Sequence, residues 1–321
     1  MCRRICKLAT LLLCHPDKSA FYTSPWFTEQ TPFVVYRGLA AIFTFLVLQG
    51  NMVVLNITSN FGWFLKFTHW GFVALTVHMC VSAAICLREH VKGRDASGGG
   101  DDDYFDDSGA GREGDDFYRN GPKMEQSLRS DEKSPKRRHH EQNRSTGPLP
   151  WYIKLDWALY NIACTHALTI SIVYYSSMGA DLSTNSWFLH VMNSIIVVTE
   201  VLICGIPTRI AHVIYPLLFM VTYLLFVYWV SSLDGFKKYG QVYAFLDFAG
   251  KTKRTAYMVV IMMIIVVPAF HLMVYVIYRC RLALLGMVKG GSVKTDPSYG
   301  KMDAQTQTDT LVSLDECDIE E

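Results

Sequence analysis

The chain has 321 residues, of which 50% are hydrophobic and 18% charged, and its mean hydropathy is +0.18. The apolar residues gather in long blocks, and the charges, which sum to a net +1, lie almost wholly between the blocks. A soluble protein spreads its apolar residues more evenly, so this distribution excludes that class. It predicts an integral membrane protein, because about 20 apolar residues cross a hydrocarbon core of about 30 Å.

In chain order, the apolar blocks cover residues 31–55, 69–87, 157–176, 187–205, 211–230 and 257–278. Each is long enough to span a bilayer and has polar or charged flanks, so we expect six transmembrane helices. Only residues 206–210 separate the fourth block from the fifth, which predicts a tight antiparallel hairpin. Arg37 falls near the predicted cytosolic end of the first block, where its long side chain would reach the headgroups. The predicted fold class is an all-α membrane protein, a bundle of about six transmembrane helices.

The segments around the blocks define the domain organisation. Residues 1–30 form a cytosolic N-terminal segment, 31–94 carry helices one and two, and 151–282 carry helices three to six. The loop 95–150 and the acidic tail 283–321 combine low hydrophobicity with dense charge, so burial offers little to offset the entropy of ordering them. We predict that both are disordered and cytosolic.

Lysine and arginine residues near the helix ends set the predicted orientation. Most lie in segments that are cytosolic if the N-terminus is inside, and this bias places both termini in the cytosol. The polar and aromatic stretch 234–253, taken as an outside loop, does not follow this bias, because it carries four lysines. We expect the protein in the plasma membrane rather than the endoplasmic reticulum.

Cysteine placement is consistent with this topology. None of the 9 cysteines lies in a predicted outside loop, so no structural disulfide is expected. Five lie near predicted cytosolic membrane faces, where cysteines can be palmitoylated; the alternative is that cysteine is simply common in apolar helices. These five are Cys2, Cys6, Cys86, Cys204 and Cys280.

Two blocks carry polar side chains at helical spacing, which places them along one face of each helix. The two sets are His190, Asn193 and Glu200 in the fourth block, and Asn161, Thr165 and Thr169 in the third. Polar groups are costly at membrane depth, so both faces should point into the bundle. They mark either interhelical hydrogen bonds or a binding or catalytic cavity. Across the short hairpin, Glu200 is expected to pair with Arg209 or His212.

Motifs of soluble enzymes are missing from the sequence. It has no nucleotide-binding glycine loop, no paired-histidine zinc signature and no serine elbow, so it predicts no metal and no cofactor. No nucleic-acid-binding module is present, and membrane lipids are the expected partners. The tail segment Thr306, Gln307 and Thr308 is similar to the short anchor by which extended peptides add a strand to dynein light chain, although three polar residues also arise by chance.

Four segments together resemble the rolling stone family of multi-pass membrane proteins. They cover most of the chain apart from the 95–147 linker and the two tails. The segments are WFTEQTPFVVYRGLAA at 26–41, NFGWFLKFTHWGF at 60–72, WALYNIACTHALTISIVYYSSM at 157–178, and residues 190–230 with their Ile206-Pro207 hairpin.

This resemblance implies two classes of function. The family's namesake is associated with myoblast fusion in insect muscle, which implies a non-enzymatic role in cell-surface membrane organisation or cell fusion. The family is also distantly similar to androgen-induced membrane hydrolases, which cleave fatty acid esters with an intramembrane threonine and histidine. Thr68 matches that threonine's context, and His190 matches the first of two histidines.

The position of the catalytic histidine is occupied by Asn193, whose amide cannot accept and return a proton as an imidazole does. We therefore predict that Thr68 is unreactive, that the protein is not an enzyme, and that a cavity shared by Thr68, His190 and Asn193 holds a lipid chain. An intramembrane lipid-ester hydrolase using Thr68, with His190 in place of the missing base, is the alternative.

Overall fold

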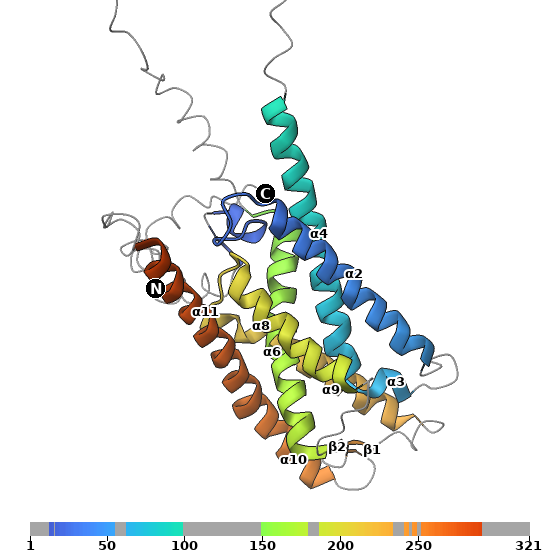
Figure 1. Ribbon diagram of the computed structural model, residues 1–321. Helices are drawn as coiled ribbons and strands as arrows, with labels where there is room; N and C mark the ends of the chain where they lie inside the picture. The colour runs from blue at the N-terminus through green and yellow to red at the C-terminus, as the bar shows by residue number, and fades with distance from the viewer. Residues whose placement is uncertain are drawn as a thin grey trace, which may run out of the picture.

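The computed structural model describes residues 13–15, 17–54, 62–98, 149–178, 186–233, 241–243, 246–248 and 252–290. All six predicted blocks are helical, and Figure 1 shows them packed as one bundle. Its main helices are α2 (Thr31–Val54), α4 (Phe67–Gly98), α6 (Trp151–Met178), α8 (Asn193–Ile203), α9 (Ile214–Ser232) and α11 (Val267–Gly290).

Shorter elements connect or extend these helices. The π-helix η2 (Trp187–Met192) leads into α8, and the 3-10 turn η3 (Ile210–Val213) leads into α9. Helix α10 (Thr252–Ile261) continues through the π-helix η5 (Met262–Val266) into α11. The remaining elements are η1 (Ser19–Phe21), α3 (Gly62–Leu65) and two antiparallel strands, β1 (Gln241–Tyr243) and β2 (Leu246–Asp247). The strands lie in the predicted 234–253 loop, so the fold is not purely α.

Four helices of the described chain are long and apolar enough to cross a membrane: Thr31–Val53, Phe67–Asp95, Ile210–Ser232 and Lys253–Lys289. The protein is therefore an integral membrane protein, although these criteria support four crossings rather than the six expected. Helix α6 misses them because its polar face lowers its hydropathy, and Trp187–Ile203 is a shorter apolar helix.

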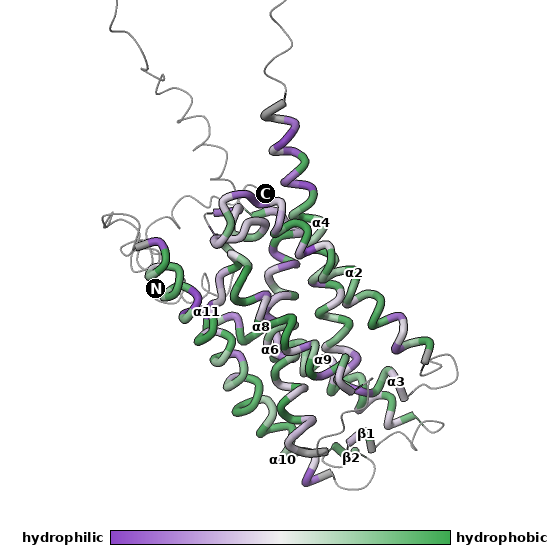
Figure 2. The backbone as a smooth tube through the Cα atoms, viewed as in Figure 1, coloured by the Kyte–Doolittle hydropathy of each residue, from purple (hydrophilic) through white to green (hydrophobic). Residues whose placement is uncertain are grey.

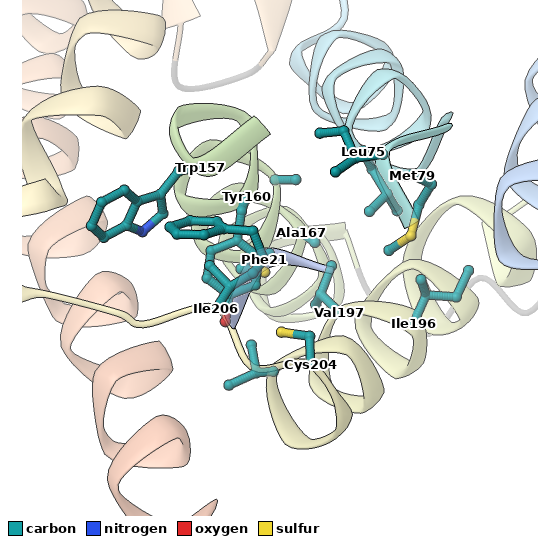
Figure 3. Close-up of a cluster of buried hydrophobic side chains, with 14 of the residues drawn as sticks. Phe21, Leu75, Met79, Trp157, Tyr160, Ala167, Ile196, Val197, Cys204 and Ile206 are labelled. Carbon is teal, nitrogen blue, oxygen red and sulfur yellow. The ribbon is translucent and has the colours of Figure 1, made fainter. Parts of the chain in front are cut away.

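Helix α6 stands at the centre of the bundle, where it contacts α4, α8, α9 and α11. This position explains its composition, because neighbouring helices rather than lipid cover its polar side chains. The largest hydrophobic cluster forms around α6, and Figure 3 shows Trp157 and Tyr160 beside Val197 and Ile206. Phe21 joins them from the N-terminal segment, with its ring 5.1 Å from that of Trp157.

Two helices continue into segments predicted to be disordered. Helix α4 runs to Gly98 and, in Figure 1, its C-terminal part stands clear of the bundle; Figure 2 shows that part to be mostly hydrophilic. Helix α11 runs to Gly290, so the helix does not stop at residue 282 as predicted. Its final turns carry apolar residues such as Leu284 and Met287, which favour continued contact with a hydrophobic environment. The predictions for residues 99–148 and 291–321 lie outside the described residues.

Candidate functional site

A buried ion pair joins α2 to α8. The guanidinium Nη2 of Arg37 lies 2.6 Å from Oε1 of Glu200, and both side chains are fully buried. The Tyr36 hydroxyl donates a hydrogen bond to Oε2 of Glu200 at 3.3 Å, and the Arg37 guanidinium also packs over the Phe33 ring. Such a pair stabilises a fold only while both partners are present, because either charge alone in a low-dielectric interior is very unfavourable.

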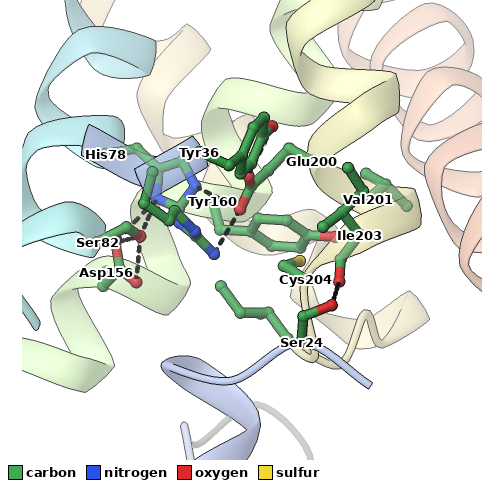
Figure 4. A network of polar contacts seen from close by, with 12 residues as sticks. Ser24, Tyr36, His78, Ser82, Asp156, Tyr160, Glu200, Val201, Ile203 and Cys204 are labelled. Atoms are coloured by element: carbon green, nitrogen blue, oxygen red, sulfur yellow. Dashed lines mark hydrogen bonds and ion pairs between the residues drawn. The ribbon is translucent and has the colours of Figure 1, made fainter. Parts of the chain in front are cut away.

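A second acidic residue extends this network to α4 and α6, as Figure 4 shows. His78 lies with Nδ1 2.8 Å from Oδ1 of Asp156 and Nε2 3.7 Å from Oε1 of Glu200. The Ser82 hydroxyl contacts both carboxylate oxygens of Asp156 at 2.7 Å. Two carboxylates, one arginine and one histidine are thus enclosed among four helices, and a protonated His78 makes the set electrically neutral.

These residues are not arranged as a nucleophile triad. In a triad, the serine donates to the histidine, whereas the carboxylate orients the histidine from its other side. Here Ser82 donates to Asp156 and lies 3.5 Å from the same His78 nitrogen, Nδ1, that contacts Asp156, and the other His78 nitrogen points towards Glu200. All four side chains are fully buried, so we interpret the network as a structural connection between helices.

The network corrects two sequence predictions. Arg37 does not reach the headgroups, because it is fully buried against Glu200. Glu200 does not pair with Arg209 or His212. Arg209 instead donates to the Cys14 carbonyl at 2.9 Å, because the extended loop after α8 carries it towards the N-terminal segment. His212 packs against the ring of Trp157.

The predicted polar face of α6 does point into the bundle. Asn161, Thr165 and Thr169 are all buried. Thr165 lies 3.0 Å from Nδ1 of His271, whose Nε2 lies 2.9 Å from the carbonyl oxygen of Arg209. Since a carbonyl only accepts, His271 donates to it from Nε2 and accepts from the Thr165 hydroxyl at Nδ1. This chain of hydrogen bonds fastens α11 to α6.

The C-terminal end of α8 is held by side chains from distant segments; we name this region, from Val201 to Arg209, the α8 cap. The last carbonyls of a helix lack partners within it. Here the Leu202 carbonyl accepts from the Trp26 indole at 2.6 Å, and the Ile203 carbonyl accepts from the Ser24 hydroxyl at 2.7 Å. Arg281 of α11, itself buried, donates to the carbonyls of Val201 and Cys204.

Burial also decides which predicted acylation sites are accessible. Cys86 and Cys204 are enclosed, whereas Cys280 is exposed. Cys2 and Cys6 lie outside the described residues. The first two thiols are therefore enclosed in this fold, and Cys280 alone among the described candidates is accessible.

At the opposite end of the bundle, where α4 begins and α6 ends, a cavity opens beneath the β1–β2 hairpin. It encloses about 720 Å³, part of which is open to the outside. Its lining comes from α4, α6, α9, the hairpin and α10–η5. The lining residues are Phe67, Thr68, Thr169, Ile170, Val173, Tyr174, Met220, Tyr223, Leu224, Tyr243, Leu246, Met258, Val259 and Met262.

Thr68 is therefore a cavity residue, but the other predicted site residues are not. Tyr174 separates the cavity from His190, because the two rings stack with centroids 3.8 Å apart. Asn193 is fully buried in α8, and its amide has no hydrogen-bond partner among the described residues. Glu200 belongs to the ion network. The shared cavity of Thr68, His190 and Asn193 is thus not observed, although His190 of η2 and Asn193 and Glu200 of α8 are all buried.

The polar side chain that contacts Thr68 in the cavity is Tyr243 of β1. Its hydroxyl accepts a hydrogen bond from the Phe67 backbone N–H at 2.9 Å and also bonds to the Thr68 side chain. Burial raises the pKa of Tyr243 above its usual value, so this neighbour is a poor proton acceptor at neutral pH. Within the described residues, no group of three or more histidine, cysteine, aspartate or glutamate side chains could hold a metal ion.

Comparison with known proteins finds similarity over a large part of the chain. A family model described as Protein rolling stone matches residues 128–289, which is half of the chain and contains α6, α8, α9 and α11. The chain belongs to the rolling stone family. The Drosophila melanogaster protein named Protein rolling stone is 25% identical over 237 residues, which are 71% of each chain. No solved structure matches.

In this rolling stone family member, sequence reasoning missed most of the ion network. Asp156 was not identified because it stands at the first turns of α6, where a charge usually meets water. His78 was missed although Ser82, four residues further on, lies on the same face of the helix. A signal was nevertheless present, since Arg37, His78 and Glu200 are ionisable groups inside apolar blocks and such groups rarely lie there without partners.

Proposed function

We propose that this rolling stone family member is a non-catalytic membrane protein that crosses the plasma membrane six times and acts in cell-surface organisation during cell–cell fusion. The observation that carries the proposal is the environment of Thr68. A threonine hydroxyl needs a neighbouring base to become a nucleophile. Besides Thr68, the described cavity lining contains three tyrosines, one further threonine and apolar side chains, and no histidine or carboxylate.

The six crossings follow from adding α6 and the η2–α8 helix to the four apolar helices. Helix α6 has 28 residues, or about 42 Å at 1.5 Å per residue, and Trp187–Ile203 is about 26 Å long. Neighbouring helices cover the polar side chains of both, so a bilayer need not do so. An even number of crossings puts both termini on one side, and the lysine and arginine bias favours the cytosol.

Topology is tested with epitope tags at both termini and near residue 109. All three should resist protease on intact cells and become accessible after permeabilisation. A tag near residue 109 that is cleaved on intact cells would exclude the orientation proposed here.

The fusion role is tested by complementation. Myoblasts that lack their own rolling stone family member are supplied with the native chain or with Thr68→Ala, at matched surface levels, and cytoplasmic content mixing is counted. Both chains should restore mixing equally. Failure of the native chain would refute the fusion role, and failure of Thr68→Ala alone would favour the hydrolase.

The hydrolase alternative is tested on purified protein with a fatty acid ester substrate. Asn193→His restores an imidazole on α8, and His190→Ala removes the neighbouring one. Turnover by the native chain that disappears in Thr68→Ala would overturn the non-catalytic proposal. No turnover by the native chain, at substrate concentrations that saturate a known esterase run in parallel, supports it.

A further inference from the structure

The cavity beneath the hairpin has the chemistry of a site for an uncharged ligand. Its described lining contains no lysine, arginine, histidine, aspartate or glutamate. A carboxylate or phosphate enclosed there would have no counter-charge, and transfer of an unpaired ion into such surroundings is strongly unfavourable.

The deeper part of the cavity suits a flexible hydrocarbon chain. Met220 and Met262 line it on opposite helices, with Met258 one turn nearer the hairpin. Methionine is unbranched and adapts its shape to irregular apolar partners. The π-helix η5 begins at Met262, so the regular α-helical wall ends where the cavity deepens.

The part nearest the hairpin carries the hydroxyl groups. Thr68 and Tyr243 bond to one another there, and the Tyr223 hydroxyl donates to the Leu65 carbonyl at 2.6 Å. Further from the hairpin, the Thr169 hydroxyl donates a hydrogen bond to the Thr165 carbonyl at 2.8 Å. A hydroxyl oxygen has two lone pairs, so the Thr68 oxygen can accept a further hydrogen bond from a ligand O–H. Polarity therefore decreases from the hairpin inwards, as it does along a lipid from its head group to its chain.

We propose that this cavity binds one uncharged, single-chain lipid with a hydroxyl-bearing head group, of the monoacylglycerol or fatty alcohol class. The head group lies beside Thr68 and Tyr243, and the chain lies between Met220, Leu224 and Met262. The leaflet rests on the orientation given under Proposed function. In that orientation the hairpin lies outside the cell, so the lipid comes from the outer leaflet.

The test is photo-crosslinking of the purified full chain in nanodiscs with a monoacylglycerol that carries a diazirine and an alkyne on its chain. Leu224→Trp fills the cavity, whereas Leu225→Trp adds the same side chain at a neighbouring residue that is 62% exposed on the outside of α9. Leu224→Trp should lower the specific labelling by about tenfold, and Leu225→Trp should label like the native chain. Equal labelling of the two variants would overturn the site.

A second pair of variants tests the site if Leu224→Trp does not fold. Met262→Phe narrows the cavity, and Ile264→Phe changes a residue of the same π-helix that is 70% exposed. The first should lose labelling and the second should keep it. If the crosslinked peptides contain none of the lining residues of α6, α9 or α10–η5, the proposal is wrong.

Ligand class is tested with two further probes that carry the same photoreactive group. A fatty acid of equal chain length differs by its carboxylate, and a sterol differs by its rigid shape. The monoacylglycerol should label about tenfold more strongly than either. Preferential labelling by the fatty acid or the sterol would refute the class proposed here.

This experiment separates binding from the proposed function. Probe cleavage by the native chain that Thr68→Ala abolishes would overturn the non-catalytic proposal but leave the binding site in place. Absence of specific labelling would overturn the binding site but leave the fusion assay unaffected.

Discussion

The two ends of the bundle differ in the chemistry of their side chains. At the α8 cap, side chains from α11 and the N-terminal segment hold the carbonyls, and the ion network lies just beneath. At the hairpin end, apolar side chains from five elements surround open space. The capped end can tolerate little change, because each polar group there depends on a specific partner. Hydrogen bonds join parts of this end as well, from the Phe67 N–H to the Tyr243 hydroxyl and from the Tyr223 hydroxyl to the Leu65 carbonyl, but most side chains that face the cavity are apolar.

Removing the Glu200 carboxylate should produce the largest effect. Glu200→Leu leaves Arg37 buried without a counter-charge, which costs about 3–5 kcal/mol in stability. The double variant Arg37→Met/Glu200→Leu should recover most of this loss, because it removes both charges. Thermal unfolding in detergent, followed by size-exclusion chromatography, measures both.

The matched control is Glu89→Leu, which disrupts a partly exposed contact with Lys92 and should change stability by less than about 1 kcal/mol. A Glu200→Leu variant that unfolds at the parent temperature would show that the ion pair contributes nothing.

Shortening one methionine at each end of the bundle sharpens the comparison. Met79 is fully buried in the main core, so Met79→Ala should cost about 2–5 kcal/mol through lost contacts and a new cavity. Met220 borders space that is already open, so Met220→Ala should cost less than half as much. Chemical denaturation in mixed micelles measures the two. Equal losses would contradict the difference drawn between the ends.

Adding one methyl group tests how tightly the cap is packed. A Cβ on Gly205 would lie 2.6 Å from the Ala20 carbonyl oxygen and 3.0 Å from that of Thr23, and backbone atoms cannot move aside easily. Gly205→Ala should therefore cost about 1–3 kcal/mol. Gly38→Ala meets nothing within 4 Å and should be neutral or slightly stabilising, because alanine favours a helix. Thermal midpoints that move equally would argue against a tight cap.

The smallest expected effect is a pH dependence at His15. Burial lowers the pKa of His15, the hydrogen bond to the Asp17 carbonyl opposes this, and the charge of Arg209 lowers the pKa further. Below an unfolded pKa of about 6.5, the unfolded chain takes up a proton that the folded segment resists. Stability should therefore fall slightly between about pH 7.5 and 5.5. The loss should be absent in His15→Phe, compared by thermal midpoint at both pH values.

Local patterns were sufficient to predict the helices but not their partners. Block length and the spacing of polar residues identified all six helices and the buried faces of α6 and α8, because both follow from helical periodicity. Arg37 and Glu200 are far apart in sequence, so only packing brings them together. Thr68 lines a cavity without His190 or Asn193, because the π-helix η2 and the stacking of His190 on Tyr174 follow from tertiary contacts that periodicity does not encode.

The α8 cap also has consequences for biosynthesis. Its donors are Ser24 and Trp26, which are translated before α8, and Arg281, which is translated after nearly all other described residues. In a nascent chain, the carbonyls of Val201 and Cys204 therefore lack the Arg281 donor until α11 has been translated. Premature termination before Arg281 would leave the cap without one of its donors. Completion of the cap therefore requires the segment before α2 and the helix α11 to be present together.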